Sequence, residues 1–106
     1  MAWLVLIAAG LFEVAWAVLL KYTEGFTRPL PTLGFGLSML ASLYLLGLAL
    51  RSLPLGTAYT VWTGIGAIGT VVLGIVLLGE PADWRRLACV ALILAGIVGL
   101  RLVTPP

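Results

Sequence analysis

The chain alternates between long apolar runs and short polar breaks. The apolar runs cover about residues 2–20, 31–50, 55–78 and 84–103. No residue is charged between Arg28 and Arg51, or between Arg51 and Glu80. A bilayer core of roughly 30 Å needs about 20 helical residues, and in lipid a helix satisfies its own backbone hydrogen bonds. The pattern therefore predicts an all-α integral membrane protein, a single domain over residues 1–106 with four transmembrane helices.

The breaks between the runs are short and contain turn residues. Pro54 suits the first turn of the third helix, and Gly79 with Pro81 ends that helix. Short connections make consecutive helices antiparallel neighbours, and an even number of helices puts both termini on one side. Basic residues flank that arrangement almost evenly: Lys21, Arg28, Arg85 and Arg86 on the loop side, Arg51 and Arg101 on the terminal side. This weak positive-inside bias permits insertion in either orientation.

Composition supports a multi-pass protein of the cell inner (plasma) membrane. The chain is 62% hydrophobic and 9% charged, whereas a soluble domain carries about 25% charged residues. The net charge of +2 is spread over the helix ends, so no basic patch indicates nucleic-acid binding. One cysteine and no histidine argue against a disulfide and a metal site. Without a phosphate-binding loop, we expect neither an enzyme nor a bound cofactor.

Glu13 is the one charge inside the first run. At about 1.5 Å per residue it lies near the bilayer midplane, where insertion of a charge costs about 2.5–3.5 kcal/mol. Loss of water favours the neutral form of a carboxyl, so we expect Glu13 to gain and lose a proton near neutral pH. The alternative is a neutral side chain that only hydrogen-bonds another helix.

Several other residues are expected at the depth of Glu13. Gly10 and Trp16 stand three residues to either side of it and share its helix face. Gly10 leaves space beside the carboxylate, and Trp16 adds a large ring. Tyr59 and Trp62 share a face of the third helix, and Ser42 lies in the middle of the second. Their O–H and N–H groups need partners when buried, which Glu13 can supply; plain helix packing is the alternative.

Gly64 and Gly66 make the third helix soft at its middle. Glycine lowers helix stability, and it permits either bending or close helix approach. The sequence alone favours neither explanation over the other.

A carboxylate beside an indole is suited to a cation. Aromatic faces attract cations, and a planar guanidinium bonds a carboxylate in fork fashion. A proton can occupy the same carboxylate instead. Two ligands that compete for one site, opened alternately to either side, are the minimum requirement of a proton-coupled antiporter. Four helices enclose little space, so a homodimer of eight helices with two Glu13 residues is expected.

The chain resembles the small multidrug resistance family over essentially its whole length. The stretches that carry the resemblance are "LFEVAWAVLLKYTEGFTR", "LPLGTAYTVWTGIGAIG" and "LILAGIVGL", in the expected order. The resemblance is strongest to the guanidinium exporter subtype. It implies homodimers whose subunits are inserted in opposite orientations, the basis of dual topology.

The resemblance also implies roles for particular residues. Glu13 matches the carboxylate that binds proton and substrate in competition, and Ser42, Tyr59 and Trp62 match its hydrogen-bonding surround. Trp16 matches the guanidinium subtype, because the polyaromatic-drug subtype has a small residue there. Gly64 and Gly66 match a bend in the third helix. Cys89 and Gly96 match a dimer contact in which the family has two glycines.

These observations predict an antiporter that exports guanidinium and small guanidinyl cations in exchange for protons. An exporter of quaternary ammonium and other lipophilic cations is the alternative within the same family, although Trp16 argues against it. A small membrane scaffold that transports nothing, with Glu13 as a link between helices, is the alternative from another class.

Overall fold

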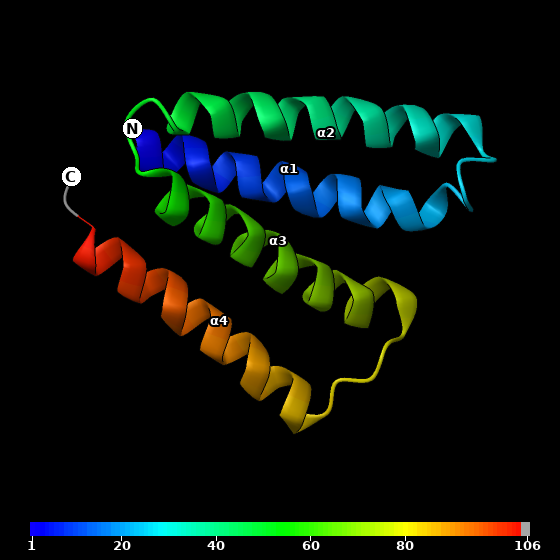
Figure 1. Cartoon of the computed structure of the whole chain (residues 1–106). Coiled ribbons are helices and arrows are strands. Elements are labelled where there is room, and N and C mark those ends of the chain that lie inside the picture. The colour runs from blue at the N-terminus through cyan, green and yellow to red at the C-terminus, as the bar shows by residue number, and fades with distance from the viewer. Residues whose placement is uncertain (105–106) are drawn as a thin grey trace.

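The computed structural model describes residues 1–104 and consists of four α-helices. They are α1 (Ala2–Tyr22), α2 (Pro29–Ala49), α3 (Leu55–Leu78) and α4 (Trp84–Val103). Each helix is long and apolar enough to cross a membrane, and no strand occurs within residues 1–104. The predicted all-α membrane protein with four spans is confirmed. Figure 1 shows the N-terminus and the end of α4 at the same end of the molecule.

Three helix boundaries, in two of the helices, differ from those expected. α1 continues past Leu20 to Tyr22, with Lys21 in its last turn, where a cation is favoured by the helix dipole. α2 begins at Pro29 and not at Pro31, and it ends at Ala49. Proline is compatible with the first turn of a helix, because the N–H that it lacks has no partner there.

The helices form a flat layer. α1 lies between α2 and α3, and α4 lies alongside α3 at the edge of the molecule (Figure 1). The molecule measures 43 × 34 × 17 Å, so its smallest dimension is less than two helix diameters of about 10–12 Å. A single layer of helices leaves both broad faces open.

The buried core lies toward the end of the molecule that holds the α2–α3 turn. Its members come from α1, α2, α3 and that turn: Leu6, Ala9, Leu46, Ala49, Leu53, Ala58, Val61 and Trp62. α4 contributes no buried residue. The first three helices therefore form the packed unit, and α4 is attached to its edge.

The two loops at the opposite end have defined backbone turns. In the α1–α2 loop, Glu24, Gly25 and Phe26 all have positive φ. The buried Thr23 hydroxyl holds this turn, because it donates to the Leu20 carbonyl at 2.7 Å and accepts from the Phe26 N–H at 3.2 Å. α3 ends at Gly79 in the left-handed conformation, with φ 68°.

Candidate functional site

The Glu13 carboxyl lies between α1 and α3, directly against Gly66. A Cβ atom added to Gly66 would overlap the Glu13 carboxyl group. Glycine at position 66 is therefore what leaves room for the acid. One carboxyl oxygen, Oε1, is buried and receives no hydrogen bond from residues 1–104. Buried polar atoms are nearly always paired, so this oxygen is free to take a ligand.

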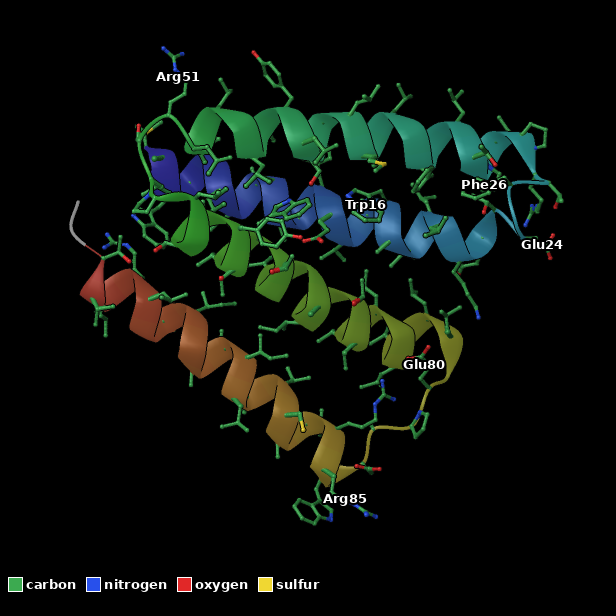
Figure 2. The ribbon with its side chains drawn as sticks, viewed as in Figure 1. Trp16, Glu24, Phe26, Arg51, Glu80 and Arg85 are labelled. Carbon is green, nitrogen blue, oxygen red and sulfur yellow. The ribbon has the colours of Figure 1, made fainter. Side chains whose placement is uncertain are left out.

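Trp16 lies where α1 faces α2 (Figure 2). Its ring meets the Phe35 ring edge-on, with centroids 5.9 Å apart and an angle of 81° between the planes. The Trp16 Nε1–H is also buried and unpaired within the described residues. Neighbouring positions on α1 thus hold a free acceptor and a free donor.

Ser42 and Trp62 form a hydrogen-bonded chain that joins three helices. The Trp62 Nε1–H donates to the Ser42 hydroxyl at 2.9 Å, and that hydroxyl donates to the Ala9 carbonyl on α1 at 2.7 Å. Both side chains are buried. Ser42 and Trp62 thus lie close to each other. However, Trp62 donates to Ser42 and Ser42 donates to Ala9, so neither donates to Glu13. These two hydrogen bonds fix α1, α2 and α3 relative to one another.

Replacing Ser42 by alanine is expected to destabilise the fold. Ser42→Ala leaves the buried Trp62 N–H and Ala9 carbonyl unpaired, and one side-chain hydrogen bond in a membrane protein contributes about 0.6–1.7 kcal/mol. The free energy of unfolding in detergent, followed by circular dichroism, should fall by about 1 kcal/mol. Ser38→Ala, one turn earlier on α2, is the control. Equal stability of the two variants would contradict the role assigned to Ser42.

Tyr59 and Gly10 are placed differently from the other candidates. Tyr59 is 54% exposed, and its ring lies 5.6 Å from the Trp62 ring at an angle of 50°. The space beside Gly10 is occupied, because an added Cβ would lie 2.7 Å from Ile65. Gly10 thus serves the close approach of α1 and α3.

Comparison with known proteins gives the family. A family model described as "Small Multidrug Resistance protein" matches residues 1–93. The chain belongs to the small multidrug resistance family. It is 57% identical over 98% of its length to a protein named "Guanidinium exporter" from Yersinia pestis, of which it covers 100%. It is also 57% identical to a protein of that name from Escherichia coli K12, covering 99% of it. The resemblance drawn from the sequence is confirmed.

Membership of the small multidrug resistance family, with four spans, makes the chain a multi-pass protein of the inner membrane. The exposed leucine, isoleucine and valine side chains of all four helices then suit an apolar environment and not water. Within residues 1–104, no group of histidine, cysteine or acidic side chains is arranged to hold a metal ion.

The remaining candidate site residues lie on α3 and α4. α3 is a continuous helix through Gly64 and Gly66. A Cβ at Gly64 would lie 2.8 Å from Ile97 of α4, so this glycine allows the two helices to approach. Cys89 and Gly96 are both exposed on α4. Their face is open in a single chain, which leaves the dimer contact a prediction.

Sequence reasoning missed two features of the site. Phe35 contacts Trp16, but its position on α2 carries no signal, since only the packing of α1 on α2 brings the rings together. For Gly66 the sequence left a bend and a close helix approach open, and the structure places it under the Glu13 carboxyl. Neither contact follows from spacing along one helix, because each joins two helices.

Proposed function

We propose that the chain is a proton-coupled antiporter that exports guanidinium and small guanidinyl cations, with proton and substrate competing for Glu13. The observation that carries this proposal is the buried, unpaired Oε1 of Glu13, with the buried, unpaired indole N–H of Trp16 three residues along the same helix. The proteins named "Guanidinium exporter", 57% identical over 98% of this chain, support guanidinium as the exported cation.

The chemistry of the pair favours a flat cation with N–H donors. Guanidinium can donate two parallel hydrogen bonds to a carboxylate and stack on an aromatic face. A proton on Glu13 removes the negative charge that attracts the cation. Each ligand therefore displaces the other, and this competition couples the flow of protons to the flow of guanidinium.

A homodimer would complete the site. The single chain is only 17 Å thick in its smallest dimension, so one layer of helices does not enclose Glu13 on both sides. α4 has no buried residue, and its Cys89 and Gly96 offer small side chains for close helix contact. We therefore propose a dimer with two Glu13 carboxyls in one cavity. Opposite insertion of the two subunits agrees with the weak charge bias of the loops.

The two alternative functions fit the structure less well. In a scaffold, Glu13 would hydrogen-bond another helix, yet its buried Oε1 has no partner among residues 1–104. Quaternary ammonium cations have no N–H group, so they would leave this oxygen unpaired, which is costly for a buried acceptor. Guanidinium satisfies the oxygen and carries the charge.

Binding of guanidinium should weaken as the pH falls. A protonated Glu13 cannot bind the cation, and lower pH increases the protonated fraction. Below the pH at which Glu13 is half protonated, the apparent dissociation constant should rise about tenfold per pH unit for each proton displaced. Guanidinium-evoked currents from purified protein in liposomes, recorded over a pH series, measure this dependence.

The same liposomes separate the alternatives. Tetraethylammonium should evoke little or no current, and a current larger than that of guanidinium would favour the quaternary ammonium exporter. An apparent affinity for guanidinium that stays constant from acidic to alkaline pH would remove the competition at Glu13.

A further inference from the structure

An apolar groove runs along α3 between α1 and α4, and the proposed binding of guanidinium does not use it. Figure 1 shows α1 and α4 on either side of α3. The outer part of the groove reaches Trp3 and Arg101, at the end of the molecule that holds the end of α4. One isoleucine from each helix, Ile7, Ile65 and Ile97, lines both the outer and the inner part. The two parts therefore form one continuous groove.

The groove is about as deep as one leaflet of a membrane. Its lining on α1 extends from Trp3 to Val14, a rise of about 16 Å, and the hydrocarbon core of a bilayer is roughly 30 Å thick. Val14 lies against Gly69 at the inner end, where an added Cβ would overlap it. Tryptophan is enriched at the surface of the bilayer, so Trp3 puts the outer end of the groove at the level of the lipid headgroups.

The size and lining of the groove suit a hydrocarbon chain. The volumes of its outer and inner parts are about 240 and 370 Å³, and ligand sites in proteins hold about 300–1,000 Å³. Among the described residues that line it, only Arg101 is charged and only Trp3 has another polar side-chain atom; the others are aliphatic or glycine. Such a surface offers no directed hydrogen bonds along its length, so it favours an apolar chain with a polar group at one end.

Arg101 supplies a cation at the outer end of the groove. The carbon of its guanidinium lies 5.0 Å from the centre of the Trp3 ring, a cation–π contact that holds the side chain beside the groove. No acid of residues 1–104 forms an ion pair with it. Its N–H groups can therefore donate to an anion, and guanidinium can donate two parallel hydrogen bonds to a phosphate.

The charges at this end of the molecule favour an anionic ligand. Figure 2 shows Arg51 at the same end as the start of α3, whereas Glu24 and Glu80 lie at the opposite end. Asp83 caps the N-terminus of α4, and Arg101 lies in the last turn of that helix. Within residues 1–104, no loop carboxylate therefore lies beside Arg101 to repel an anion.

The groove lies away from the residues assigned to the dimer contact and from Trp16. Ile7 and Trp16 are nine residues apart on α1, and Cys89 and Val98 are nine residues apart on α4. At 3.6 residues per turn, nine residues make two and a half turns, so the members of each pair point to opposite sides of their helix. Ile7 and Val98 line the groove. A second subunit placed on Cys89 and Gly96 therefore leaves the groove open to the bilayer.

We propose that this groove binds one acyl chain of an anionic phospholipid, whose phosphate is held by Arg101 at the membrane surface. The chain lies along Ile65 and Ile97 and packs between α1 and α4. Because α4 contributes no buried residue to the core, a lipid in this position adds apolar contacts that fix α4 against the other helices. The site is independent of the proposed exchange at Glu13.

Lipid binding to the purified, delipidated protein tests the role of Arg101, and native mass spectrometry measures it. Dioleoylphosphatidylglycerol should bind more tightly than dioleoylphosphatidylcholine, which has the same acyl chains but no net charge. Arg101→Gln should weaken binding of the anionic lipid about five- to tenfold, the factor that loss of one cation beside a lipid phosphate represents. Arg51→Gln is the matched control, because it removes a cation at the same end that does not line the groove. Equal affinities of the two variants, or no preference of the unmodified protein for the anionic lipid, would overturn the proposal.

A photoreactive lipid tests the position of the acyl chain. Phosphatidylglycerol with a diazirine in one acyl chain should label peptides of α1, α3 and α4 that line the groove. Ile7→Trp puts an indole where the two parts of the groove meet, so it should remove this labelling. Leu4→Trp, at an exposed position of α1 outside the groove, should keep it. Labelling that persists in Ile7→Trp would overturn the proposal. Loss of assembly in Ile7→Trp alone, measured by size-exclusion chromatography, would assign the groove to the partner subunit and overturn it as well.

Discussion

Glu13→Gln abolishes proton-coupled guanidinium transport while the protein still folds and assembles. Glutamine has nearly the same shape, so the contact with Gly66 is kept, but it carries no charge and does not exchange a proton. Loss of one partner from a buried, hydrogen-bonded charge pair costs about 2–5 kcal/mol. Guanidinium affinity should therefore fall at least about 30-fold, and proton release on guanidinium addition should disappear.

Guanidinium binding is measured by tryptophan fluorescence, to which Trp16 should contribute. Assembly is measured by size-exclusion chromatography in detergent. Glu24→Gln is the matched control, since Glu24 is an exposed carboxylate outside the helices. It should leave binding, transport and assembly unchanged. If Glu13→Gln retained proton-coupled flux, the exchange site would lie elsewhere; if it only prevented assembly, Glu13 would be a link between helices.

Gly66→Ala should be nearly as damaging, although the substitution adds only one methyl group. The new Cβ would overlap the Glu13 carboxyl, so the carboxyl must move or α3 must shift away from α1. Overpacking of this kind costs about 1–3 kcal/mol, and the carboxyl leaves its place between α1 and α3. We expect guanidinium affinity to fall about tenfold or more, the factor that corresponds to about 1.4 kcal/mol, with transport reduced accordingly.

Two further alanine variants of α3 distinguish the reasons for this effect. An added Cβ at Gly56 meets no atom of the described residues within 4 Å, so Gly56→Ala should be harmless. Gly64→Ala would press on the end of the Ile97 side chain at 2.8 Å, which can rotate away. If bending of α3 is what both glycines provide, Gly64→Ala and Gly66→Ala should impair transport equally. If the contact of Gly66 with Glu13 is the cause instead, only Gly66→Ala should reduce the affinity for guanidinium.

The four spans could be predicted because lipid imposes a simple rule on sequence. A charge is costly in the bilayer, so uncharged runs mark the spans, and the breaks around Pro54 and Gly79 mark their ends. Glu13 stood out for the same reason, as the one charge inside the first run. The family followed from the order of three stretches and was confirmed by the family model. The ends of α1 and α2 were less certain, since a chain can continue as a helix into its polar flanks.

The contacts between helices depended on the tertiary structure. Ser42 and Trp62 were expected to serve Glu13, but the packing of α1 against α2 brings the Ala9 carbonyl within reach of the Ser42 hydroxyl. Gly66 received its place under Glu13 from the way α3 lies along α1. Hydropathy and spacing describe one helix at a time, so the sequence determined which segments enter the membrane and which acid enters with them. The rotation and depth at which two helices meet depend on the side chains of both helices. Only the tertiary structure therefore decided what Glu13 touches.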